Sequence, residues 1–221
     1  MTLTPVVQLR GVSKRFESTG AVSRVLEGVD LTVEAGQKVS LVGPSGSGKS
    51  TLLALIAGLL RPDAGTVQLE GVLLSDLDDG QRAEMRAQRI GIALQSDNLI
   101  PFLSVRENVE LALGFGGRRS RGSQARALLN RLGVAHRASH FPRQISGGEA
   151  QRVALAVALA NSPRLLLADE MVAQLDAATA GSVIREVFGA DMAVLFVTHD
   201  LSLADQADVR LRIRDRQVVV R

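Results

Sequence analysis

A glycine-rich segment near the start of the chain has the residues and spacing of a phosphate-binding loop. Residues 43–50 read Gly-Pro-Ser-Gly-Ser-Gly-Lys-Ser and match the pattern G-x-x-x-x-G-K-[ST] at every fixed position. Glycines let the backbone turn so that successive N–H groups face phosphate oxygens, and the helix expected next presents its partly positive end to the same anion. Lys49 is predicted to reach the β- and γ-phosphates, and Ser50 to bind Mg²⁺ through its hydroxyl. The predicted nucleotide contacts are Gly43, Pro44, Ser45, Gly46, Ser47, Gly48, Lys49, Ser50 and Thr51.

Two adjacent carboxylates follow an apolar run and form a second candidate site. Leu165–Ala168 predicts a buried strand, and Asp169 and Glu170 come directly after it. Acids at the carboxyl edge of a parallel sheet lie where such sheets bind ligands. We expect Asp169 to hold Mg²⁺, directly or through water, and Glu170 to orient and deprotonate the attacking water. A solvated acidic turn is the alternative, which the phosphate loop in the same chain disfavours.

A third segment discriminates among the classes that share a phosphate loop, which include kinases, GTPases, helicases and transport ATPases. Residues 145–152 read Ile-Ser-Gly-Gly-Glu-Ala-Gln-Arg and open an alanine-rich helical pattern. Ser146, Gly147 and Gly148 offer a hydroxyl and backbone amides at a helix start, which is a second place for an anion. Alone, the segment would be an ordinary helix cap. It resembles the signature of the ABC ATPase family, L-S-G-G-x-x-x-R, with Ile145 at the leucine position.

The resemblance covers essentially the whole chain and implies roles for further residues. Gln95 matches the glutamine that contacts the metal-bound nucleotide, and His199 matches the switch histidine near the γ-phosphate. Asp176 matches the end of the loop that crosses between paired subunits, and Phe16 falls where the family has an aromatic stacked on adenine. Each has an ordinary structural explanation when taken singly. Their order along the chain is what favours the family.

The resemblance also implies cofactors and partners. In this family two ATP molecules with Mg²⁺ lie between two subunits, because the signature of one subunit completes the nucleotide site of the other. A homodimer or pseudo-dimer is therefore expected, together with a membrane-spanning permease on a separate chain. Loss of the γ-phosphate on hydrolysis would release the paired surfaces and drive the permease. We expect the chain to be cytoplasmic and peripheral on the inner face of the cell membrane.

Residues 99–109, which begin Leu-Ile-Pro-Phe, look most like ATPases of lipoprotein-release and macrolide-export systems. A solute importer would have almost the same ATPase, and relatives on this pattern also serve cell division without moving a substrate. A GTPase is disfavoured because the chain has no Asn-Lys-x-Asp motif. One departure concerns Met171 and Val172, where the family usually has proline and threonine; we expect activity with altered geometry, and a weakened site is the alternative.

The elements that must position these residues follow from the hydrophobic pattern. Val6–Arg10 and Leu26–Val33 predict strands of an antiparallel edge, and Lys38–Val42 predicts a strand leading into the phosphate loop. Helical periodicity recurs through the middle of the chain, at Asp79–Gln88, Ser104–Leu113, Ser123–Leu132 and Glu149–Ala160. We therefore expect a single α/β P-loop domain with mostly parallel strands. Residues 1–78 and 160–221 would form its core, and about 79–159 an inserted helical subdomain.

Composition restricts the remaining classes. The chain has 221 residues, 46% hydrophobic and 22% charged, which suits a folded domain with a sizeable core. It contains no cysteine, which excludes disulfides and thiolate metal sites. The net charge of +3 is a small excess, and there is neither Tyr nor Trp to stack on bases, so nucleic acid is not an expected partner.

Overall fold

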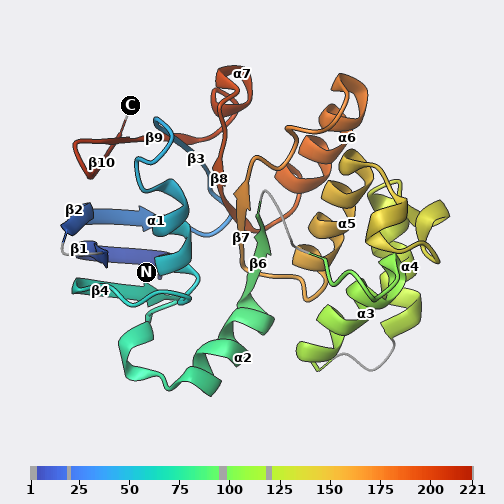
Figure 1. Ribbon diagram of the computed structural model, residues 1–221, viewed down its shortest axis with the longest axis horizontal. Coiled ribbons are helices and arrows are strands. Elements are labelled where there is room, and N and C mark those ends of the chain that lie inside the picture. Colours follow the sequence, from blue (N-terminus) through green and yellow to red (C-terminus); the bar gives the residue numbers. More distant parts are fainter. Residues whose placement is uncertain (1–3, 19–20, 95–98, 118–120, 221) are drawn as a thin grey trace. The chain divides into compact units, whose positions relative to one another are not determined.

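A computed structural model of the chain describes residues 4–18, 21–94, 99–117 and 121–220 (Figure 1). The chain divides into two compact units, one made of residues 1–83 and 193–221 and the other of residues 84–192. Each unit contains some of the residues predicted to act on a nucleotide. The helical subdomain expected at about 79–159 has other boundaries than the second unit, and it stays a prediction.

The first unit begins with an antiparallel sheet in the order β2-β1-β4-β5. Its strands are β1 (Val7–Ser18), β2 (Ala21–Val33), β4 (Ala64–Leu69) and β5 (Val72–Leu73). The antiparallel edge is thus confirmed, but β1 and β2 are longer than the strands expected at 6–10 and 26–33. The hairpin continues because cross-strand pairs run on to Glu17 and Val22 after register shifts that follow Leu9. Bulges of this kind interrupt the apolar alternation that marks a strand in the sequence.

The first unit also holds the strands that lead to the phosphate loop. β3 (Lys38–Val42) pairs in parallel with β8 (Ala193–Val197) on one side and with β9 (Val209–Arg214) on the other. All residues of β8 are buried, as its unalternated apolar run predicts. All residues of β3 are buried as well, including the polar Lys38 and Ser40. The short β10 (Gln217–Val220) closes an antiparallel hairpin with β9. Helix α1 (Lys49–Ile56) packs against β4, and α7 (Leu201–Ala204) packs against β3.

The second unit combines a parallel strand pair with a cluster of helices. β6 (Ile90–Ala93) pairs in parallel with β7 (Leu165–Asp169). Helices α3 (Val105–Phe115), α4 (Arg121–Arg131) and α5 (Gly147–Leu159) pack on one another, as Figure 1 shows. Helix α6 (Ala177–Phe188) follows β7, and α2 (Asp79–Arg89) runs from the first unit into the second. Gly91 lets β6 approach α5, since a Cβ atom there would collide with the carbonyl oxygen of Ala158.

These elements confirm the α/β class, the parallel pairing of β3 with β8 and β9 and of β6 with β7, and most of the expected helices. Short 3₁₀ turns at Leu74–Asp76, Ala135–Arg137 and Pro142–Gln144 were not expected from the periodicity. Among the described residues, no helix combines the length and hydrophobicity needed to cross a membrane.

Candidate nucleotide-binding and hydrolysis site

The phosphate loop leaves β3 and enters α1 through glycines whose backbone angles or close neighbours disfavour a side chain. Gly46 and Gly48 have φ angles of 75° and 102°, in the left-handed region that favours glycine. A Cβ atom at Gly48 would lie 2.9 Å from a methyl carbon of Val25, and one at Gly43 would lie 2.8 Å from Oγ of Ser47. A side chain at Gly46 or Gly48 would thus strain the backbone, and one at Gly43 or Gly48 would displace a neighbouring side chain. The loop therefore has the turns that the sequence pattern predicts, and its contact with phosphate stays a prediction.

Lys49 is the buried cation of this loop. The residue is 8% exposed, and its ammonium donates to the carbonyl oxygens of Gly43 and Pro44, each at 2.8 Å. Its charge therefore lies across the loop, beside the amides that would face a phosphate. Oγ of Ser47 is buried and has no hydrogen-bond partner within the described part of the chain. Buried hydroxyls are normally paired, so this one suits a ligand that brings an acceptor.

A cavity of about 590 Å³ borders the loop within the first unit. Pro44, Gly46 and Ser47 form its loop side. Its remaining wall comes from β2 and from the β9–β10 hairpin, including Arg24, Arg212, Arg214, Asp215 and Arg216. Four arginines against a single aspartate in this lining create a positive potential, which suits an anionic ligand.

Phe16 and His199 also belong to the first unit. The Phe16 ring is 41% exposed, and the Lys14 ammonium lies 5.5 Å from its centroid. On β2 its cross-strand partner is Ser23, a residue of the cavity wall. His199 follows β8 and is exposed. Because β8 pairs in parallel with β3, His199 and the phosphate loop leave neighbouring strands at the same edge of the sheet.

The two acids end β7 in the second unit. The four residues before Asp169 are buried, whereas Asp169 and Glu170 are half-buried, so the strand brings both carboxylates to the sheet edge. Glu170 has a φ angle of 56°, which is uncommon for a residue with a side chain. Strained backbone of this kind is concentrated at functional positions and has to be held by its surroundings.

Gln151, on α5, holds that strained turn from both ends. Its Nε2 donates to the carbonyl oxygen of Glu170, and its Oε1 accepts from the backbone N–H of Gln174 at 3.2 Å. Met171, one of the two departures from the family pattern, is 2% exposed and packs into the core, while Val172 accepts a backbone bond from Leu175 at 3.1 Å. The turn is thus fixed by packing and by Gln151 where the family has proline.

The signature segment, residues 145–152, forms a complete helix cap. Ser146 precedes α5, and its Oγ accepts from the backbone N–H of Glu149 at 3.2 Å. In return, Oε2 of Glu149 accepts from the backbone N–H and the hydroxyl of Ser146, at 2.8 and 3.0 Å. The helix therefore begins at Gly147, two residues earlier than apolar periodicity predicts, because this capping box satisfies its first donors.

The signature glycines are required by the loop after β7. A Cβ atom at Gly147 would collide with Oε1 of Gln174, and one at Gly148 would lie 2.8 Å from the carbonyl oxygen of Gln174. Asp176 caps α6 through Oδ1, which accepts from the N–H groups of Ala178 and Thr179 at 3.1 and 3.0 Å. Hydrogen bonds from the Thr179 side chain, and then from these N–H groups, lower the pKa of Asp176. The Asp176 carboxylate thus has a capping role in this fold.

Sequence reasoning missed the contacts on the other oxygen of Glu149. Oε1 accepts from Nε of Arg137 at 2.8 Å and lies 3.2 Å from Nε2 of His136. These contacts, led by the hydrogen bond from Arg137, hold the pKa of Glu149 at about 2, below its ordinary value of 4.5. The Ser-x-x-Glu spacing could have signalled the cap. Nothing in the spacing of Arg137 signals its partner twelve positions away.

The structure therefore gathers the predicted residues into two groups. The phosphate loop with Ser50, Thr51, Phe16 and His199 lies in the first unit, and the acids with Asp176 and the signature segment lie in the second. Gln95 falls outside the described residues, so its predicted contact with the metal stays a prediction.

Comparison with known proteins gives a consistent result. A family model described as "ABC transporter" matches residues 26–173. The chain is 43% identical over 217 residues to lipoprotein-releasing system ATP-binding protein LolD 2 of Caulobacter vibrioides, covering 96% of this chain and 95% of that protein. It is 38% identical to macrolide export ATP-binding/permease protein MacB 2 of Aeromonas hydrophila, covering 97% of this chain but 34% of that longer protein. Among solved structures, a dimeric post-hydrolysis state of the ATP-binding cassette MJ0796 with ADP and Pi has a TM-score of 0.91 and 36% identity, covering 96% of each chain.

Proposed function

This chain belongs to the ABC transporter family, and we propose that it is the ATP-hydrolysing motor subunit of a lipoprotein-release or export system. Within the family it is an ATP-binding cassette with ATPase activity. The observation that carries the proposal is the pairing, in one chain, of a complete phosphate loop with a capped signature segment. Kinases and GTPases use the first but have no need of the second.

The phosphate loop supplies the binding part of the reaction. Backbone amides of residues 46–50 and the Lys49 ammonium would hold the β- and γ-phosphates, and the arginines of the adjoining cavity add attraction for the anion. Phosphate oxygens compete well for Lys49, because its present acceptors are neutral carbonyls whereas phosphate is charged. Phe16, exposed on β1, offers a face for the adenine ring.

Hydrolysis needs a water placed in line with the γ-phosphate and a group to take its proton. Glu170 would accept a proton as the water oxygen bonds to the γ-phosphorus. The bond from that phosphorus to the bridging oxygen then breaks, giving ADP and inorganic phosphate. His199 would donate a hydrogen bond to the γ-phosphate as its charge is redistributed. The fixed turn at Glu170 suits this task, since a base must keep its distance to the water.

Mg²⁺ is the expected metal, and the chain provides suitable ligands. Ser50, Asp169 and Gln95 carry oxygen donors, which Mg²⁺ prefers, and Ser50 is exposed in the first turn of α1. When bound, the ion would neutralise charge on the β- and γ-phosphates.

Two copies of the chain are proposed to pair head to tail around ATP. The signature serine is exposed at the start of α5 in the described structure, where it can meet the nucleotide of a second copy. The similar cassette MJ0796 is dimeric in its post-hydrolysis state with ADP and Pi, which supports this arrangement. Asp176, at the end of the loop beside the signature glycines, would lie near the same contact.

The partner of this motor is proposed to be an integral-membrane permease on a separate chain, which would place the cassette on the cytoplasmic face of the membrane. Phe102 and Phe115, both in the second unit, are 77% and 68% exposed. Large exposed phenyl groups are common anchors of protein interfaces. The name of the similar LolD 2 protein, a lipoprotein-releasing ATP-binding protein, supports the release type. An importer ATPase and a cell-division regulator remain the alternative systems.

Co-purification tests this assignment. The chain is expressed together with the membrane protein that is encoded beside its gene, and the two are extracted in mild detergent. We expect the chain to retain a four-helix permease with a large outer domain. Phe102→Asp should lower the co-purified permease at least about tenfold, the loss expected when an interface anchor is removed.

The matched control is Leu59→Asp, which places the same charge on an apolar residue of the other unit that is 53% exposed. It should leave the yield of permease unchanged. Retention of a six-helix permease with a solute-binding protein would instead favour an importer.

A further inference from the structure

The hydroxyl of Ser146 uses its single hydrogen in a hydrogen bond within the helix cap. It donates to Oε2 of Glu149 at 3.0 Å, while its oxygen accepts from the Glu149 N–H. A serine hydroxyl has one hydrogen to give. If Ser146 is to donate to a γ-phosphate, as the proposed function requires, it must turn that hydrogen away from Glu149. The Glu149 carboxylate then loses a hydrogen-bond donor, although the residue is buried, with 8% of its surface exposed.

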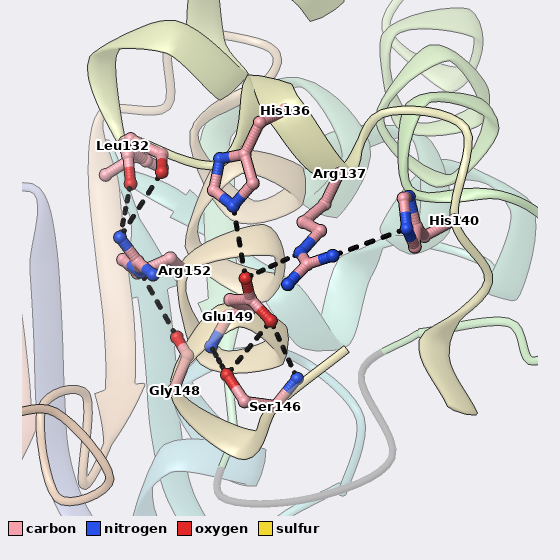
Figure 2. Close-up of polar contacts among 9 residues, drawn as sticks. Leu132, His136, Arg137, His140, Ser146, Gly148, Glu149 and Arg152 are labelled. Atoms are coloured by element: carbon pink, nitrogen blue, oxygen red, sulfur yellow. Dashed lines mark hydrogen bonds and ion pairs between the residues drawn. The ribbon is translucent and has the colours of Figure 1, made fainter. Parts of the chain in front are cut away.

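Arg137 and His136 contact the other oxygen of the Glu149 carboxylate, as Figure 2 shows, and so make up for the lost donor. Nε of Arg137 lies 2.8 Å from Oε1 of Glu149, and Nε2 of His136 lies 3.2 Å from the same atom. The Ser146 backbone N–H still donates to Oε2 at 2.8 Å whichever way the hydroxyl points. The carboxylate can therefore stay in place when the hydroxyl leaves, because its charge is already paired.

The segment that carries these side chains is itself anchored. The backbone N–H groups of Val105 and Arg106, in the first turn of α3, donate to the carbonyl oxygens of His140 and Ala138 at 2.8 and 3.0 Å. Nη1 of Arg137 also lies 3.4 Å from Nε2 of His140. Arg137 thus reaches Glu149 from a rigid support, which keeps the cost of orienting its long side chain low.

Resting on the proposed function, we propose that Arg137 is a positioning residue of the signature: it holds Glu149 so that Ser146 can turn its hydroxyl toward the ATP of a second copy. Arg137 does not touch that nucleotide. Its effect is on the pairing step, and the phosphate loop of its own chain is unaffected.

The test uses a Glu170→Gln background, in which ATP is bound without turnover, and follows pairing by size-exclusion light scattering as ATP is titrated. Arg137→Gln should raise the ATP concentration for half-maximal pairing about tenfold, the size of one charge-assisted hydrogen bond. Binding of a fluorescent ATP analogue to the single chain should be unchanged. Arg137→Lys, which keeps the charge, should recover part of the loss.

Arg143→Gln is the matched control, because Arg143 is an exposed arginine of the same segment, in the turn Pro142–Gln144. It should pair as the parent does. A double-mutant cycle separates positioning from general stability. If Arg137 acts through Glu149, adding Arg137→Gln to Glu149→Gln should cause little further loss.

Two outcomes overturn the inference alone: pairing of Arg137→Gln at the parent's ATP concentration, or losses from the two substitutions that add in full. If the Glu170→Gln parent itself fails to pair with ATP, the proposed function fails, and the inference fails with it.

Discussion

Replacing Lys49 with alanine is expected to abolish ATP binding and to lower hydrolysis by at least about 10²-fold, the scale of losing a preorganised charge contact. Lys49 is the buried cation of the phosphate loop, and its ammonium is already directed across the loop by Gly43 and Pro44. No neighbouring lysine can replace it, since the closest in sequence are Lys38 and Lys14. Binding of a fluorescent ATP analogue and release of phosphate measure the two effects.

Arg61→Ala is the control for loss of a positive charge in the same unit. Arg61 is exposed, and its Nη2 lies 3.6 Å from Oδ1 of Asp79. Exposed ion pairs of this kind contribute little to stability. Both variants should show wild-type circular dichroism. Near-normal turnover in Lys49→Ala would contradict the assignment of the phosphate loop.

Glu170→Gln is expected to bind ATP normally, to lose about 10²- to 10⁴-fold in turnover, the range for removal of a general base, and to accumulate as an ATP-loaded pair. The change is nearly isosteric. It should not disturb the turn, because Gln151 holds the backbone carbonyl of residue 170 and not its side chain. Single-turnover hydrolysis and nucleotide content after gel filtration report the two effects.

Glu110→Gln, which removes an ion pair with Arg106 on α3, should hydrolyse ATP as the unmodified chain does. Full-rate hydrolysis by Glu170→Gln would place the base elsewhere. The same assay on the unmodified chain tests whether Met171 and Val172 are compatible with turnover, as the packed turn leads us to expect.

Local patterns predicted much of this molecule because their physical requirements lie within a few residues. The phosphate loop needs only a buried strand, three glycines and a helix in succession, and the sequence pattern predicted all of them. The buried strands β7 and β8 were equally clear. The length of the β1–β2 hairpin was not, because register shifts interrupt the alternation of apolar residues.

Contacts across longer stretches of chain could not be predicted from spacing. Gln151 meets Glu170 nineteen positions away, and Arg137 meets Glu149 only because two 3₁₀ turns bring the chain back to α5. The positive φ of Glu170 is likewise a product of packing, since nothing about a glutamate favours it. These tertiary contacts fix the position of the turn at Glu170 and of the signature segment.

The central claim is that the phosphate loop of one copy and the signature segment of another bind a single ATP between them. It can be tested by mixing two disabled variants, both carrying Glu170→Gln. One adds Lys49→Ala, which removes its own phosphate site. The other adds Ser146→Asp, which keeps a residue that caps helices well but sets a negative charge against the γ-phosphate.

With a tag on one variant, capture and nucleotide analysis show whether the two complement each other. The account predicts that neither variant pairs with itself in ATP, whereas the mixture forms a mixed pair with a single ATP per pair, since one intact loop then faces one intact signature. Failure of the mixture to pair under conditions where the Glu170→Gln parent does, or self-pairing of the Ser146→Asp variant as readily as the parent, would contradict a site shared between two copies.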